Sequence, residues 1–169
     1  MTPSYRDATG ADAAALAELG ARSFSDTFGH LYDPADLALF LANHTPAAWA
    51  AELGDPAFAV RVAEADGAMI GYAKRGPSHL PFTPRGTPTE LRQLYVLGPW
   101  QGAGVAATLI EWVIDSARRN GADELYLSVF TDNHRARRFY EKYGFVAEGS
   151  YAFMVGNHAD EDIVMRLAL

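Results

Sequence analysis

LYVLGPWQGAGVAATLIEW, residues 94–112, joins an apolar run to a helical pattern through a glycine-rich turn. The apolar run predicts a strand over residues 90–96, and the spacing of the apolar residues after the turn predicts a helix from about Gly104 to Arg119. Successive backbone N–H groups at such a helix start face one point, so residues 101–106 can form an anion-binding cradle. A tight turn whose glycines only relieve backbone strain is the alternative that this segment leaves open.

The rest of the chain alternates between helical and strand patterns. Asp66-Gly67 favours a two-residue hairpin turn, so the segments on either side of it are expected to pair in antiparallel. A further turn is predicted at Gly156-Asn157. Together these elements predict an α/β (α+β) fold, with a mixed, mostly antiparallel sheet of about six or seven strands flanked by helices. The expected strands are 4–9, 58–65, 68–75, 90–96, 124–130, 145–150 and 162–167, and the expected helices are 12–28, 34–41, 46–56, 104–119 and 134–143.

Composition limits the classes of function. The chain has 169 residues, 49% of them hydrophobic, which predicts a single domain over residues 1–169. Its 21 acidic and 14 basic residues give a net charge of −7, which disfavours binding to nucleic acid. The absence of cysteine and the spacing of the five histidines predict no metal site. The first twenty residues carry no signal-peptide pattern and no segment suits a bilayer span, so a cytoplasmic location and no membrane partner are expected.

Two other phosphate-binding motifs fit the glycine-rich turn poorly. A Walker loop requires a lysine at the start of the helix, and this turn contains none. The spacing of Gly102, Gly104 and Ala107 matches the dinucleotide-binding fingerprint formally. That fingerprint places an acidic residue at the end of the following strand, whereas Asp123 and Glu124 stand at the start of theirs. Dinucleotide binding is therefore disfavoured.

Residues 94–112, with LSVFTDNHRARRFYEKYGF at 127–145, resemble the GNAT superfamily, whose members transfer acetyl groups from acetyl-CoA to amines. The pyrophosphate motif of the family, Gln/Arg-x-x-Gly-x-Gly/Ala, is matched by Gln101, Gly104 and Ala106. A downstream asparagine is matched by Asn133, and the family's F-Y-x-x-x-G-F segment by residues 139–145. The resemblance covers at least residues 90–145. One departure is Gly98-Pro99, which displaces the family's proline by one position and predicts a changed turn around an intact site.

The resemblance implies that the fourth and fifth strands splay apart and hold the pantetheine arm of acetyl-CoA between them. It implies that Tyr140 protonates the departing thiolate and that Glu90 deprotonates or attracts the amine, which attacks directly in a ternary complex. Each residue has a structural alternative, because Tyr140 could be a core aromatic residue and Glu90 a solvated charge at a strand end. The residues implied to bind the coenzyme are Leu94, Tyr95, Val96, Gln101, Gly102, Ala103, Gly104, Val105, Ala106, Asn133 and Tyr140.

The two ends of the chain, SFSDTFGHLYDPADL at 23–37 and FVAEGSYAFMVGNHADEDIVMRL at 145–167, resemble the bacterial spermine/spermidine N-acetyltransferase branch. This resemblance implies a small amine partner, a polyamine, bound against Phe24, Asp26, Phe28, Tyr32 and Asp33. Packing of amphipathic helices is the alternative for the phenylalanines. Two other functions stay open: acetylation of a protein N-terminus, an amino acid or an antibiotic amine, and a non-catalytic role as an acyl-CoA-binding regulator. The oligomeric state also stays open, a homodimer included.

Overall fold

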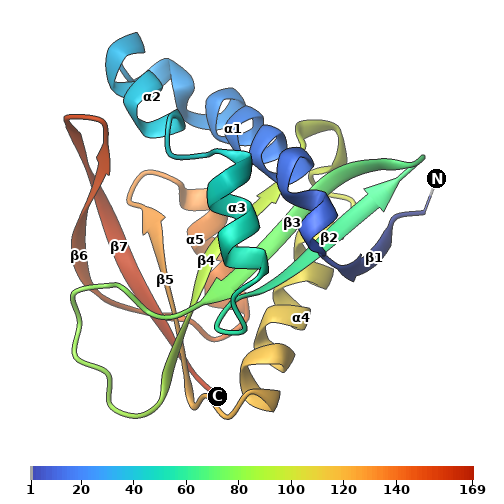
Figure 1. The fold of residues 1–169 in the computed structure, drawn as a ribbon. Coiled ribbons are helices and arrows are strands. Elements are labelled where there is room, and N and C mark those ends of the chain that lie inside the picture. Colours follow the sequence, from blue (N-terminus) through green and yellow to red (C-terminus); the bar gives the residue numbers. More distant parts are fainter. Residues whose placement is uncertain (1) are drawn as a thin grey trace.

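The computed structural model describes residues 2–169. Seven strands form one sheet in the order β1-β2-β3-β4-β5-β7-β6 (Figure 1). β4 and β5 pair in parallel and every other neighbouring pair is antiparallel, which confirms the expected mixed sheet. The strands are β1 (Ser4–Asp7), β2 (Ala59–Ala65), β3 (Ala68–Gly76), β4 (Pro88–Val96), β5 (Glu124–Phe130), β6 (Val146–Val155) and β7 (His158–Ala168).

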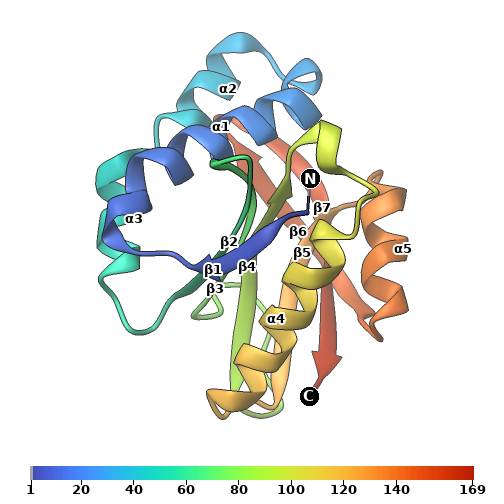
Figure 2. The same ribbon diagram turned by 90° about the vertical axis from the view of Figure 1, so that its right-hand side faces the viewer.

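Helices cover both faces of the sheet (Figure 2). α1, α2 and α3 lie on one side, and α4 and α5 lie on the other. No helix within residues 2–169 has the length and apolar character that crossing a membrane requires. The helices are α1 (Ala13–Phe28), α2 (Pro34–Leu41), α3 (Pro46–Leu53), α4 (Val105–Arg119) and α5 (His134–Lys142), with short 3-10 turns η1 (Gly10–Asp12), η2 (Gly29–Leu31) and η3 (Gly98–Trp100).

Apolar side chains fix the helices to the two faces. On α4, Leu109, Ile110 and Val113 recur at helical spacing and are fully buried against β3 and β4. On the opposite face, Leu16 of α1 and Trp49 of α3 are buried with strand residues of β2 and β3. Burial of each such side chain contributes about 1.5–3 kcal/mol, so both helical layers are held firmly on the sheet.

The two predicted hairpin turns are confirmed, but the second hairpin is longer than expected. Asp66 and Gly67 adopt φ angles of 55° and 76°, the left-handed pair that a tight hairpin turn requires. At the other turn, β6 and β7 stay paired as far as Val155 and His158, beyond the predicted strand ends. The predicted last strand began late because residues 157–162 are mostly polar and lack apolar alternation. Backbone pairing with β6, rather than burial of an apolar face, extends the start of β7.

β4 and β5 are paired at one end and separate toward the other. Their pairing runs over three positions, Pro88–Glu90 against 124–126, and ends there. Opposite β3, a bulge interrupts β4 between Leu91 and Gln93 and bends the strand. Figure 1 shows the resulting V-shaped gap, in which β5 and the β6–β7 pair lean away from β3 and β4. This gap is the splay that the resemblance implied, and the candidate site lies at its open end.

Candidate active site

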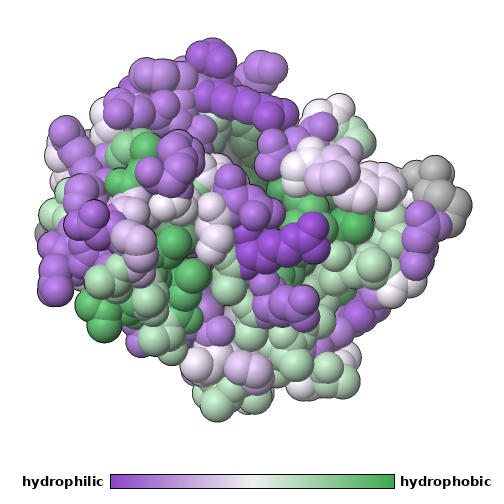
Figure 3. Space-filling view, turned by 90° about the horizontal axis from the view of Figure 1, so that it is seen from above, coloured by the Kyte–Doolittle hydropathy of each residue, from purple (hydrophilic) through white to green (hydrophobic). Residues whose placement is uncertain are grey.

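Two pockets meet at the open end of β4 and β5. One has a volume of about 390 Å³ and lies below α1 and α2, and we call it the aromatic pocket. The other has a volume of about 420 Å³, lies between the glycine-rich turn and α5, and is called the glycine pocket. Figure 3 views this end of the molecule, where apolar residues show in hollows between hydrophilic ones. The residues that line both pockets are Thr27, Leu94, Val96, Gln101, Asn133, Ala136 and Tyr140.

The glycine-rich turn opens its backbone toward the glycine pocket. Gly102 and Gly104 have φ angles of 82° and 84°, and a Cβ atom built on either would meet no protein atom within 4 Å. The following N–H groups of Val105, Ala106 and Ala107 begin α4 and have no intrahelical carbonyl to bind. Positive φ values and free N–H groups at a helix start together form a site that suits a pyrophosphate.

The Gln101 side chain holds the glycine-rich turn in place through two hydrogen bonds. Its Nε2 donates to the Val96 carbonyl at 3.1 Å, and its Oε1 accepts from Arg135 at 3.1 Å. The turn itself contains the 3-10 piece η3 around Pro99. Because Gln101 ties the end of β4 to α5, its amide positions the cradle, and Arg135 adds a cation to the wall of the glycine pocket.

Not every residue implied for the coenzyme lines a pocket. Ala103 donates its N–H to the Trp100 carbonyl at 3.3 Å, so that N–H is used within the turn. The Val105 side chain is buried in the core beneath α4, which leaves only its backbone N–H at the cradle. Tyr95 lines the aromatic pocket but not the glycine pocket. The other residues implied for the coenzyme lie at one or both pockets.

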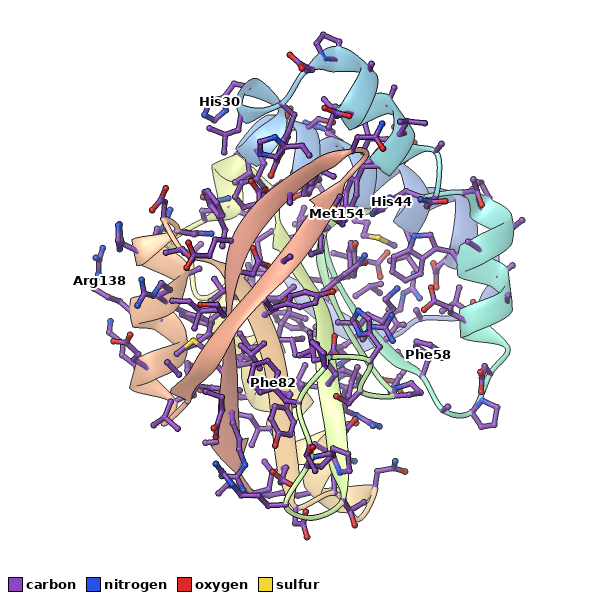
Figure 4. All side chains as sticks on the ribbon, turned by 90° about the vertical axis from the view of Figure 1, so that its left-hand side faces the viewer. His30, His44, Phe58, Phe82, Arg138 and Met154 are labelled. Carbon is purple, nitrogen blue, oxygen red and sulfur yellow. The ribbon has the colours of Figure 1, made fainter. Side chains whose placement is uncertain are left out.

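The basic residues that follow on α5 have different surroundings. Arg137 donates to the Thr131 carbonyl at 3.0 Å, and Arg138 points outward from α5 (Figure 4). Arg135 is therefore the arginine of this helix that reaches the glycine pocket.

α5 and its N-cap residue place two side chains at the seam, by which we mean the residues that line both pockets. Asn133 caps the helix, because its Oδ1 accepts from the Ala136 N–H at 3.2 Å. The Tyr140 ring makes edge contacts with the rings of Phe139 and Phe145, at centroid distances of 5.4 and 5.7 Å. Burial, with a smaller contribution from Tyr95, raises the pKa of Tyr140 above its ordinary value. The phenol therefore keeps its proton across the physiological range.

Glu90 is 2% exposed and lines the aromatic pocket. Its Oε1 accepts from the backbone N–H of His79 at 3.0 Å and lies 2.8 Å from His79 Nδ1. Arg92 Nε lies 3.4 Å from the other carboxylate oxygen. The sequence predicted only a loop position for His79, since it lies eleven residues from Glu90 in a segment with no secondary-structure pattern. Because half of the His79 side chain is exposed, the ring connects the buried carboxylate with solvent.

Eight phenylalanine and tyrosine rings line the aromatic pocket, and all of them except Tyr95 and Tyr140 belong to one cluster of six rings. Phe24, Phe28 and Tyr32 line the pocket as the resemblance implied, and Phe40, Phe130 and Phe153 complete the cluster. The rings form a connected cluster, with centroid distances of 4.3 Å for Phe24–Phe40 and 5.7 Å for Phe40–Phe153. The last three rings come from α2, β5 and β6, so no local pattern could have assigned them to this site.

The structure does not bring Asp26 and Asp33 to either pocket. Phe24 and Phe28 are four residues apart and share one face of α1, so Asp26 between them points away and meets Arg22 at 3.8 Å. Asp33 is exposed at the start of α2. The carboxylates that the first two helices were expected to supply come instead from β7.

Besides Glu90, the acidic residues that line this pocket are Asp160 and Asp162. They alternate along β7, so both side chains lie on the same face. Asp160 accepts from the Tyr32 hydroxyl and lies 3.1 Å from His158 Nε2. Asp162 is 6% exposed, and burial together with Asp160 raises its pKa to about 7. The i, i+2 spacing in His-Ala-Asp-Glu-Asp was the only local signal, and it required knowing that β7 begins at His158.

Within residues 2–169, no three His, Asp or Glu side chains lie together in an arrangement able to hold a metal ion.

Comparison with known proteins identifies relatives of the whole chain. The family model described as acetyltransferase (GNAT) family matches residues 15–145. An uncharacterized N-acetyltransferase of Mycobacterium tuberculosis is 37% identical over 157 residues, which cover 91% of this chain and 96% of that protein. The structure of YncA from Salmonella typhimurium with its cofactor acetyl-CoA is 25% identical, covers 100% of this chain and 95% of that one, and has a TM-score of 0.73. A similar fold occurs in the PaiA N-acetyltransferase from Thermoplasma acidophilum in complex with coenzyme A, which is 19% identical with full coverage of both chains and a TM-score of 0.79.

Proposed function

The chain belongs to the acetyltransferase (GNAT) family, and we propose that it acetylates a small primary amine, a polyamine, held in the aromatic pocket. It is an acetyl-CoA-dependent N-acetyltransferase. The observation that carries the choice of acceptor is the combination of six aromatic rings with buried carboxylates in one cavity. Rings pack against methylene groups and attract cations, while carboxylates pair with ammonium groups.

In this proposal acetyl-CoA enters through the glycine pocket. The pyrophosphate sits on the N–H groups at the start of α4, with Arg135 nearby. The pantetheine arm lies in the gap between β4 and β5, where Leu94 and Val96 have no pairing partner on β5 and line the glycine pocket together with Asn133. This path brings the thioester to the seam, beside Tyr140.

The amine must lose its proton before it attacks. An alkylammonium with a pKa of about 10.4 is largely charged at pH 7, and the neutral form lies about 4.6 kcal/mol higher. Glu90 receives the proton in our proposal, and His79, 2.8 Å away, passes it to solvent. The amine nitrogen bonds to the thioester carbonyl carbon, the carbon–sulfur bond breaks, and Tyr140 donates a hydrogen bond and then its proton to the thiolate. The second proton that the new amide nitrogen loses restores the phenol of Tyr140.

Release of the coenzyme A thiol tests this function. Wild-type protein with acetyl-CoA should release thiol when spermidine, spermine or 1,5-diaminopentane is added, and the slow rate without amine should be far lower. A peptide amine or an amino acid that supports faster turnover than these amines would overturn the acceptor assignment and leave the acetyltransferase intact. Bound acetyl-CoA with no turnover on any amine would favour a regulatory protein instead.

A further inference from the structure

The aromatic pocket contains a carboxylate that the protein itself does not neutralise. Asp162 is 6% exposed, and the neighbouring side chain that favours its ionised form is the uncharged Ser128 hydroxyl. Among the described residues no arginine, lysine or histidine forms an ion pair with it, whereas Asp160 beside it meets His158 and Tyr32. Burial of a carboxylate without a cationic partner is costly, so such a group in a cavity marks a place for a cation supplied from outside.

The surroundings of Asp162 select the chemistry of that cation. Phe130 stands opposite Asp162 in the pairing of β5 with β7, and the ring of Phe130 contacts Phe28 at a centroid distance of 6.3 Å. Tyr32 belongs to the same cluster, because its ring stacks on Phe24 at 5.9 Å. Rings around a carboxylate accommodate an alkyl chain that ends in an ammonium group better than a strongly hydrated metal ion.

Asp162 also lies away from Glu90 along the sheet. Glu90 is level with Tyr126 on β5, and Asp162 is level with Phe130. Four residues of strand separate these positions, which is roughly 13 Å along β5. Two anionic points separated in one cavity suit an acceptor with two positive charges separated by a methylene chain.

We infer that Asp162, supported by Asp160, binds the second, non-reacting ammonium group of the acceptor and so selects diamines and polyamines over monoamines. This inference rests on the proposed function. The reacting amine lies at the seam near Tyr140, the methylene chain lies along the aromatic rings, and the distal ammonium pairs with Asp162. Asp160 is already engaged by Tyr32 and His158, and it holds negative charge next to Asp162.

Two acceptors that differ only in the second charge test this assignment. For the wild type, kcat/KM on 1,5-diaminopentane should exceed that on 1-aminopentane by about tenfold or more, the effect of one ion pair in a partly dry site. Asp162→Asn keeps the shape and removes the charge. This variant should lose most of the preference through a higher KM for the diamine, with kcat/KM for 1-aminopentane and KM for acetyl-CoA within about threefold of wild type.

A surface charge provides the matched control. Asp115→Asn removes one carboxylate from the exposed side of α4, outside both pockets, and should keep the wild-type preference. As a readout that does not depend on turnover, 1,5-diaminopentane should raise the melting temperature of the wild type and of Asp115→Asn but not that of Asp162→Asn.

The outcomes separate the two levels of the proposal. An Asp162→Asn variant that keeps the full preference for the diamine overturns the inference and leaves the acetyltransferase function standing. Equal loss on both acceptors also overturns it, because Asp162 would then act on the reacting amine. A wild type that acetylates neither amine, although it binds acetyl-CoA, overturns the acceptor proposed above and this assignment with it.

Discussion

At the scale of single residues, Tyr140 carries the proposed step that ends the reaction. Tyr140→Phe removes only the hydroxyl, so kcat should fall about a hundredfold while the affinity for acetyl-CoA stays near wild type. Single-turnover rates with saturating amine, together with calorimetric titration of acetyl-CoA, give both quantities. Tyr143→Phe is the matched control on the same helix end, because its hydroxyl meets Glu111 at 3.4 Å outside both pockets. Full turnover by Tyr140→Phe would show that this tyrosine is a core aromatic residue and that its hydroxyl takes no part in the reaction.

Glu90 is the residue for which charge can be removed at constant shape. In Glu90→Gln the amide oxygen can still accept from the His79 N–H, so the loop keeps its contact. We expect kcat/KM to fall at least tenfold and the acidic limb of its pH profile to move or disappear, because a general base must be unprotonated to act. The rate profile over pH 5–9 checks this, with Glu18→Gln on the exposed face of α1 as the control. An unchanged acidic limb would show that a water chain or another carboxylate takes the proton.

Three of the residues that the resemblance assigned to the coenzyme share a local pattern with their neighbours. Gln101, Asn133 and Tyr140 each belong to a short motif on one turn or helix, and the structure brings all three to the seam. Asp162 and His79 had no such motif. Their positions in the pocket depend on strand pairing and on a loop that folds back over β4, which are contacts between residues far apart in the chain.

At the scale of elements, the glycine-rich turn with the start of α4 is the unit that can be tested alone. Gly104→Ala places a methyl group where the phosphate would approach, since a Cβ there meets no protein atom. Its φ of 84° also makes alanine strained by about 1–2 kcal/mol. Gly121→Ala has the same strain at a φ of 85° and lies outside both pockets, so it isolates the effect on binding.

Calorimetry of the two glycine variants should therefore give different results. Both should unfold at a lower temperature than the wild type, but only Gly104→Ala should lose affinity for acetyl-CoA, by about tenfold or more. Equal affinities of the two variants for acetyl-CoA would contradict the proposal that the pyrophosphate binds at the start of α4.

Element boundaries were predictable wherever the signal was local. The strand, turn and helix from β4 to α4 follow from one continuous segment, and Asp66-Gly67 sets its hairpin by backbone conformation alone. The insertion of β7 between β5 and β6 follows from long-range pairing, and no segment of the sequence encodes it by itself. The polar start of β7 was missed for the same reason, because backbone pairing with β6 stabilises it without an apolar face.

At the scale of the whole molecule, Glu124 holds the closed end of the gap between β4 and β5. This carboxylate is 1% exposed, meets Arg166 at 2.5 Å and Tyr126 at 2.7 Å, and also accepts from the Gly86 N–H. These partners outweigh the cost of its burial and lower the pKa of Glu124 to about 2. The contribution of the ionised Glu124 to the free energy of unfolding is therefore complete above its ordinary pKa of 4.5 and is lost as the pH falls from 4.5 toward 2.

Glu124→Gln should thus cost about 3 kcal/mol of unfolding free energy at pH 7, because Arg166 loses its buried partner. The difference from wild type should shrink at pH 3. Urea unfolding at the two pH values measures it, and Asp7→Asn, which breaks the exposed pair with Arg61, should cost at most about 1 kcal/mol. A loss for Glu124→Gln that is the same at both pH values would mean that shape, rather than charge, closes this end of the sheet.

The central claim is that the acetyl group passes from acetyl-CoA to an amine in the aromatic pocket. Mass spectrometry of the amine product, with the coenzyme A thiol titrated in the same reaction, measures this directly. With 1,5-diaminopentane we predict one monoacetylated diamine for each thiol released, and both signals should fall together in Tyr140→Phe. Thiol release without acetylated amine, or acetyl-CoA that stays intact at every amine concentration, would contradict the account.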